Sequence, residues 1–449
     1  MDDYKYLTKE EVLHRGQDMI GIPFGDIDKT NRLKGNKGGV GQMVEENWFG
    51  YSPNSDANAD FEEAGVELKV TPYIKGPKGI RAKERLVCNI INYMTEWEKT
   101  FETSDYWKKN ETTLIMSYQY IKEVPKSEYT VDRAVLFSFP ETDLMIIKQD
   151  WEKIMQKVRN GEAHLLSEGD TLYLGACTKG ASAKSVRQQP FSEILAKQRA
   201  YSLKQSYMTT ILNKYIFGNE TDEHIIKDWH DLQTRPFEDI IIDRLKKYYN
   251  YSQTELKKMF ELEGNSKNIN ELLVSKMLGV KGKVSKTAEF QNADITPKTI
   301  RVQKSGKVKE SMSFPNFKFT ELIKEDLWED SDLYNQLAPK KFLFIIFQER
   351  EDGEYYFDRA IFWNIPVQDL EEVQKVWKQT KETIKKGVQI TEVNGKFKNN
   401  LPSASENPVA HVRPHGKNRD DTYPLPDGRE LTKQCFWLNN TYIAKQISK

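Results

Sequence analysis

The sequence is short of the residues that hold small secreted or zinc-bound proteins together. Three cysteines occur in 449 residues, an odd number and far apart, which argues against a disulfide framework. Six histidines are scattered and no C-x2-C pair is present, so a zinc site is not expected. The N-terminal letters MDDYKYLTKEEVLHRG lack the pattern of a secretory leader. We therefore expect a cytoplasmic protein.

Long apolar runs and an excess of one charge are also missing. No stretch approaches the roughly 20 apolar residues that a membrane span needs, so we expect no membrane partner. Since 67 basic residues balance 67 acidic ones, the net charge gives the chain no general attraction for a polyanion such as DNA, but it does not exclude a local basic groove. The glycine-rich letters KGNKGGVG lack the G-K-[ST] ending of a phosphate-binding loop, and no nucleotide cofactor is expected. The length predicts two domains.

A charged strand stands out in the letters ADFEEAGVELKV at 59–70. Apolar residues alternate with Glu67 and Lys69, the two-residue period of a half-buried strand. Gly65 permits a sharp turn that returns Asp60 to the neighbourhood of Glu67. Two carboxylates and a lysine suit Mg²⁺ and an attacking water. The same letters also fit an ordinary solvated strand face.

A short helix is predicted just before this strand, in the letters VGQMVEENWFG. Its apolar residues recur at helical spacing, with Glu45 and Glu46 beside them. One of these acids can supply a third carboxylate to the strand, or both can lie on a solvated helix face.

An internal repeat links the two halves of the chain. Residues 49–70 align without a gap to residues 278–299, and the spacing is kept while the chemistry changes. Asp60 is matched by Glu289, Glu67 by Thr296, and Lys69 by an identical lysine. We therefore predict a catalytic domain at 1–220, a helical connector at 221–250 and a degenerate copy of the first domain at 251–449.

These motifs together resemble the MutH family of PD-(D/E)xK nucleases. The resemblance rests on a glutamate before Asp60, on D-x6-E-L-K, and on the segments ETS, TKGASAK and RAYSLKQSY. The two-half layout is similar to the MutH-like type II restriction endonucleases that recognise GATC. It implies an α/β fold, a mixed sheet flanked by helices, duplicated in tandem.

The resemblance also implies the chemistry. Asp60, Glu67 and Glu46 become ligands of Mg²⁺, and Lys69 lies beside the attacking water. Glu45 competes with Glu46, because the preceding interval holds one residue more than the family pattern. The implied reaction is a cut in both DNA strands before the G of GATC, leaving 5′ overhangs with 5′ phosphates, as part of restriction-modification.

Basic loops are the expected DNA contacts in both halves, since lysine and arginine supply phosphate and base contacts. They lie in KGNKGGVG, CTKGASAKSVRQQP and KQRAYSLKQSY of the first half, and in HVRPHGKNRDD and TKQCF of the second. The candidate residues are Lys37, Lys179, Lys184, Arg187, Arg199, Lys204, Arg413, His415, Lys417, Arg419 and Lys433.

Two alternatives of other kinds remain beside the restriction enzyme. One is a MutH-like GATC nickase of mismatch repair, and the other is a catalytically silent DNA-binding module. Because only the first half keeps the acids, the hypothesis of a restriction endonuclease predicts that the second half binds DNA as an effector. It also predicts that two copies of the chain meet on DNA to cut both strands.

Overall fold

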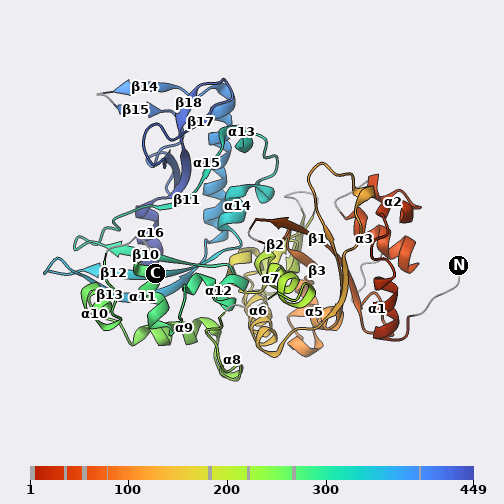
Figure 1. The fold of residues 1–449 in the computed structure, drawn as a ribbon. Helices are drawn as coiled ribbons and strands as arrows, with labels where there is room; N and C mark the ends of the chain where they lie inside the picture. Colours follow the sequence, from red (N-terminus) through yellow and green to blue (C-terminus); the bar gives the residue numbers. More distant parts are fainter. Residues whose placement is uncertain are drawn as a thin grey trace. The chain divides into compact units, whose positions relative to one another are not determined.

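The computed structural model describes residues 6–34, 38–52, 58–77, 79–180, 185–219, 223–264, 269–393 and 396–448. The chain folds into two compact units (Figure 1). The first unit contains Met1–Phe237 and Lys286–Asp294, and the second contains Glu238–Ser285 and Ile295–Lys449. The predicted connector, 221–250, is therefore divided between them. Within the described ranges, no helix combines the length and apolar character needed to cross a membrane.

A mixed sheet forms the centre of the first unit. Strand β1 (Glu67–Gly76) runs parallel to β4 (Thr113–Gln119), which pairs antiparallel with β5 (Arg133–Phe137). A short β2 (Gly79–Ala82) folds back antiparallel on β1. The β4 residues are almost all buried, as expected for a strand covered on both faces.

Helices pack beside this sheet. Helix α1 (Lys9–Gln17) begins with a capping box, in which Thr8 accepts from the Glu11 amide and the Glu11 carboxylate accepts from the Thr8 amide. Helix α6 (Glu141–Arg159) buries residues at three- and four-residue spacing, which is the pattern of a core-facing helix. Further helices of this unit are α2 (Phe24–Ile27), α4 (Tyr93–Glu96), α5 (Asp105–Asn110), α7 (Gln205–Thr210), α8 (Asp231–Thr234) and α12 (Ala288–Asn292).

A second, three-stranded sheet completes the first unit. Strand β9 (Arg199–Leu203) lies between β3 (Leu86–Ile90) and β6 (Leu174–Thr178), antiparallel to both. All five β9 residues are buried. The hairpin β7 (Val186–Gln189) and β8 (Ser192–Lys197) follows β6.

The second unit repeats this order of strands. Strand β10 (Ile295–Val302) runs parallel to β12 (Lys341–Glu349), which pairs antiparallel with β13 (Tyr355–Trp363). A separate sheet places β19 (Gln434–Leu438) between two antiparallel neighbours, β11 (Met312–Phe317) and β16 (Ala410–Pro414). This shared order supports the predicted duplication, which remains an inference from the repeat.

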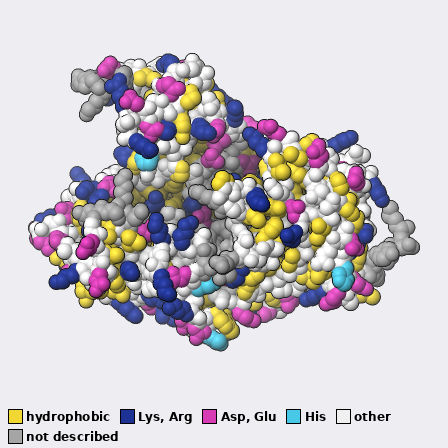
Figure 2. Space-filling model, in the orientation of Figure 1, with side chains coloured by type: hydrophobic (Ala, Val, Ile, Leu, Met, Phe, Trp, Pro, Cys, Tyr) yellow, Lys and Arg dark blue, Asp and Glu magenta, His cyan; other side chains and the backbone are white. Residues whose placement is uncertain are grey.

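The core of the second unit gathers residues from both of its sheets and from the long helix α15 (Val367–Lys386). Its other helices are α9 (Phe237–Lys246), α10 (Gln253–Met259), α11 (Ile269–Met277), α13 (Phe319–Leu322), α14 (Asp332–Leu337) and α16 (Asn440–Ile447). Its remaining strands are β14 (Ile390–Val393), β15 (Lys396–Asn399), β17 (Thr422–Pro424) and β18 (Glu430–Thr432). Basic and acidic side chains are interspersed over the visible surface, in keeping with the balanced charge (Figure 2).

Candidate active site

Glu67, the first residue of β1, is buried with 1% of its surface exposed. This rules out a solvated strand face for that acid. A buried carboxylate needs partners, and Glu67 has them. Its Oε1 lies 2.5 Å from the Lys69 ammonium, and its Oε2 accepts from the Asp60 amide at 3.2 Å. Burial raises the pKa of Glu67, while the positive charges of Lys69 and Lys109 oppose that rise.

Asp60 returns to Glu67 as the sequence predicted. Phe61 and Val66 pair their backbones in an antiparallel bridge, and the turn between them uses Gly65 at a φ of 63°. Asp60 Oδ2 then accepts from the Leu68 amide at 3.0 Å. The two carboxylates thus exchange backbone hydrogen bonds across the turn, which fixes them side by side.

Lys109 is a site residue that the sequence reasoning missed. It lies on α5, and its side chain is 8% exposed. Its ammonium lies 3.4 Å from Glu67 Oε2 and 3.9 Å from Asp60 Oδ1, and it donates to the Asn58 carbonyl at 2.9 Å. Lys109 is the second lysine of the letters KKN, which directly follow ETSDYW. No local sequence pattern shows that its side chain turns inward.

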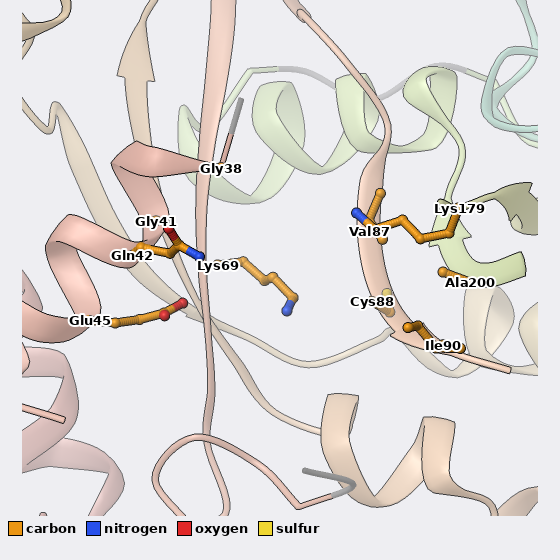
Figure 3. Close-up of a pocket in the computed structure, with 10 residues that line it drawn as sticks. All are labelled: Gly38, Gly41, Gln42, Glu45, Lys69, Val87, Cys88, Ile90, Lys179 and Ala200. Atoms are coloured by element: carbon orange, nitrogen blue, oxygen red, sulfur yellow. The ribbon is translucent and has the colours of Figure 1, made fainter. Parts of the chain in front are cut away.

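Glu45 and Glu46, the two candidates for the third acid, lie in different surroundings. Glu46 pairs with Arg32, whose Nε donates at 2.8 Å, and accepts from Thr30 at 3.2 Å. Glu45 instead lines a pocket together with Lys69, and its carboxylate points into that pocket (Figure 3). The Glu46 carboxylate is therefore engaged away from the pocket.

An irregularity of the helix explains why Glu45, and not Glu46, faces the pocket. Helix α3 (Gly39–Met43) continues into a π-helical turn, Val44–Phe49, which ends at Gly50 in the left-handed region with a φ of 79°. Such a turn accommodates one extra residue in a helix and rotates the residues within it. Burial raises the pKa of Glu45 to about 7, and the nearby negative charge of Asp60 adds to the shift.

The pocket beside these residues has a volume of about 360 Å³. Lys69 reaches into it between Glu45 and the strands β3 and β9 (Figure 3). Lys179, a predicted DNA contact, lies on its opposite wall. The lining residues are Gly38, Gly41, Gln42, Glu45, Lys69, Val87, Cys88, Ile90, Lys179 and Ala200.

Two predicted DNA contacts of the first unit are buried in this structure. Arg199 and Lys204 are 4% and 5% exposed, because Arg199 is the first residue of the buried central strand β9 and Lys204 directly follows the last. Arg199 donates to the Ala176 carbonyl and Lys204 to the Thr171 carbonyl, each at 2.6 Å. Both basic groups therefore support the fold.

The other predicted contacts of the first unit are differently placed. Arg187 is exposed on β7, with its Nε donating to Gln198 at 3.0 Å. Lys37 and Lys184 lie outside the described residues.

The basic residues predicted as DNA contacts in the second unit lie on β16 and on the chain that follows it. Arg413, His415, Lys417 and Arg419 are exposed. Lys433 is half-buried and forms an ion pair within the same unit.

The donor set fits a hard divalent cation. Asp60 and Glu67 already share one positive charge, the Lys109 ammonium, so their oxygens converge on a place suited to a cation. Mg²⁺ favours one or two carboxylates supplemented by water and phosphate oxygens. Within the described part of the chain, no three His, Cys, Asp or Glu side chains group closely enough to hold a metal by themselves. Glu45 accordingly faces the pocket without joining the carboxylate pair.

Comparison with known proteins agrees with this geometry. The family model of the DNA mismatch repair enzyme MutH matches residues 49–150, a range that contains Asp60, Glu67, Lys69 and Lys109. The MutH proteins of Shewanella woodyi and Vibrio campbellii are 30% and 26% identical, over 46% and 48% of this chain and 92% and 97% of their own. A MutH-sized segment therefore accounts for about half of the molecule.

A longer relative covers both halves. The type II restriction enzyme Sau3AI of Staphylococcus aureus is 40% identical over 98% of this chain and 99% of its own. Restriction and MutH-like enzymes act on double-stranded DNA and generally use divalent metals. The chain belongs to the MutH-like type II restriction endonucleases, which are site-specific deoxyribonucleases.

Proposed function

We propose that this enzyme cuts both strands of DNA at 5′-GATC-3′, before the G, with Mg²⁺ as its metal, and that the first unit carries the catalytic site. The observation that carries the proposal is the buried pair of Asp60 and Glu67, with Lys69 held at 2.5 Å from Glu67 on the edge of a pocket. The cut position and the sequence follow from the resemblance to GATC-specific enzymes. The products carry 5′ phosphates and 5′ overhangs.

Asp60 and Glu67 would hold the metal through the oxygens that now face Lys109. A Mg²⁺ ion held there would supply positive charge beside the scissile phosphate and would make a neighbouring water easier to deprotonate. Lys69 would orient the attacking water and stabilise the negative charge that develops on the phosphate oxygens. Its ammonium is suited to this because Glu67 fixes it on one side while the other side faces the pocket.

Glu45 would act as the third acid of the reaction from across the pocket. Its pKa of about 7 means that it exchanges a proton readily near neutral pH, which suits a group working through a water molecule. Glu46 has no such position, since Arg32 and Thr30 engage it.

The second unit would bind DNA as an effector without cutting it. Thr296 stands at the place of Glu67 in the repeat and cannot serve as a carboxylate ligand. Glu289, at the place of Asp60, lies in the segment that belongs to the first unit, and it accepts hydrogen bonds there from the Ile225 and Ile226 amides. With one catalytic set per chain, cutting both strands would bring a second copy of the enzyme to the DNA.

A plasmid assay tests the proposal. Purified full-length protein and Mg²⁺ are incubated with supercoiled plasmid containing GATC, and the ends are mapped. Linear fragments with GATC overhangs are the expected result. Open circles alone would point to a MutH-like nickase, and binding without any cut to a silent DNA-binding protein.

A Glu67 variant tests the role of the proposed catalytic site. Glu67→Gln keeps the side-chain shape and removes the charge. It is expected to lower the cleavage rate at least about a thousandfold, in line with loss of charge stabilisation in the transition state, while specific DNA binding is retained. Lys108→Gln, on the exposed side of α5, is the matched control.

A further inference from the structure

Tyr51 carries a buried hydroxyl beside the acids of the first unit. Within the described part of the chain, no group forms a hydrogen bond with that hydroxyl. Leaving a buried donor unbonded costs stability, so few such groups persist in native structures, and each one needs an explanation. The surroundings of this hydroxyl supply one.

Three carboxylates act on the Tyr51 hydroxyl. Burial raises the pKa of Tyr51, and the largest further contribution comes from the negative charge of Asp60. Glu45 and Glu67 act in the same direction. The Asp60 carboxylate approaches the hydroxyl, but without the length and angle of an ordinary hydrogen bond. Because a carboxylate accepts and a neutral phenol donates, the hydroxyl is a donor placed among acceptors.

The ring of Tyr51 is fixed beside these acids by its packing and its backbone. It stands edge-on to Phe61, the residue after Asp60, with ring centres 5.4 Å apart at 80°. The Tyr51 amide donates to the Glu45 carbonyl at 3.1 Å, directly after Gly50 in the left-handed region at a φ of 79°. The turn that ends the helix of Glu45 therefore also sets the position of the hydroxyl.

The second unit provides an internal comparison. At the place of Gly50, the repeat has Gly279, which keeps the left-handed backbone at a φ of 72°. The next residue is Val280 where the first unit has Tyr51, and it is 4% exposed. The repeat also has Thr296 at the place of Glu67. The glycine turn is thus common to both units, whereas the hydroxyl occurs only in the unit that has the pair of carboxylates.

We infer that Tyr51 is a positioning residue of the metal site, whose hydroxyl donates to Asp60 and holds that carboxylate in the orientation that binds a divalent cation. Asp60 can accept this bond, because its Oδ2 takes the Leu68 amide and a carboxylate offers about four acceptor positions. Carboxylates that bind metals are commonly held by such outer hydrogen bonds. The inference rests on the proposed role of Asp60 as a ligand of the metal.

Tyr51→Phe tests the inference, because it removes the hydroxyl and keeps the ring. Mn²⁺, which like Mg²⁺ favours carboxylate oxygens and water, is titrated into the full-length protein, and free Mn²⁺ is measured by electron paramagnetic resonance. The variant is expected to bind Mn²⁺ about 10- to 100-fold more weakly. In EDTA its denaturant midpoint should equal or exceed that of wild-type protein, because a buried donor without a partner has been removed.

Tyr106→Phe is the matched control. The Tyr106 hydroxyl is also buried and without a hydrogen-bond partner among the described residues. Burial raises its pKa, with smaller contributions from Cys88 and Asp150, so its neighbours are not the site acids. This variant should bind Mn²⁺ as wild-type protein does. In single-turnover cleavage by Tyr51→Phe, the Mg²⁺ concentration for half-maximal rate should rise about 10- to 100-fold, and the maximal rate should change less.

The overturning results are distinct from a failure of the proposed function. Unchanged Mn²⁺ affinity in Tyr51→Phe would overturn the positioning role, and so would an equal loss of affinity in Tyr106→Phe. A lower denaturant midpoint of Tyr51→Phe in EDTA would overturn it as well, since that result assigns the hydroxyl to folding. Each of these results can occur while Asp60→Asn weakens Mn²⁺ binding and wild-type protein cuts GATC. If Asp60→Asn leaves Mn²⁺ binding unchanged, the proposed metal site itself fails.

Discussion

Replacing Lys109 by methionine tests how the two site carboxylates are kept together. The change removes an ammonium 3.4 Å from Glu67 and 3.9 Å from Asp60 and keeps an apolar side chain of similar length. At 3.4 Å and an effective dielectric constant of about 20, the attraction to Glu67 alone is roughly 5 kcal/mol before desolvation. Lys69 still pairs with Glu67, so the expected loss in unfolding free energy is smaller, about 2 to 4 kcal/mol.

Because Lys109→Met leaves the two carboxylates with more uncompensated negative charge, the loss in unfolding free energy should also depend on the metal. Without Lys109, the carboxylates gain more from a divalent cation, so Mg²⁺ should stabilise the variant more than the wild-type protein. The assay is chemical denaturation of the full-length chain with EDTA and with Mg²⁺. Lys108→Met, the exposed neighbour on α5, is the matched control. Equal stability of the two variants in EDTA, or the same gain from Mg²⁺ in the variant and in wild-type protein, would refute the role given to Lys109.

Three further predictions follow from the same geometry. Glu45→Gln should slow cleavage and remove a rise in rate with pH near 7, because its carboxyl loses its proton there, whereas Glu46→Gln should leave that profile unchanged in single-turnover assays. Lys179→Ala should weaken DNA binding and reduce the salt slope of log K by about 1, as measured by fluorescence titration; an unchanged slope would argue against a phosphate contact. The hydrogen bond with Glu289 raises the pKa of His224, and that bond and two backbone amides lower the pKa of Glu289 despite burial. The contribution of His224 to stability is complete below its unfolded pKa of about 6.5 and is lost as the pH rises through the folded pKa, whereas the contribution of Glu289 is present above about 4.5 and is lost as the pH falls. His224→Gln should therefore lower the Tm at pH 6 more than at pH 9. An equal loss at both pH values would contradict this.

Part of the site could be predicted because it is local in sequence. Asp60, Glu67 and Lys69 lie within ten residues, and a two-residue strand period with one glycine turn is enough to bring them together. Lys109 could not be found this way. Its approach to Glu67 depends on the packing of α5 against the loop before β1, a contact between segments far apart in the chain.

The choice between Glu45 and Glu46 shows a different limit. The sequence revealed one extra residue, but it did not show that a π-helical turn absorbs it, and the turn decides which acid faces the pocket. Arg199 and Lys204 show a further limit. They were predicted as DNA contacts because they are basic, and their letters do not show that β9 is the central strand of its sheet, where both side chains are buried.

Helix α12 gives the molecule an unusual vulnerability to truncation. This short helix lies in the later half of the sequence, yet it belongs to the first unit, where Asn292 accepts from Ser206 and Thr210. Phe290 of the same helix is 1% exposed and lies against Phe237. A protein truncated near residue 250 would therefore lack α12, which is part of the packing of the first unit. Loss of activity in such a protein would not report on the role of the second unit. The two units alternate along the chain, so no single stop codon yields the complete first unit free of residues of the second.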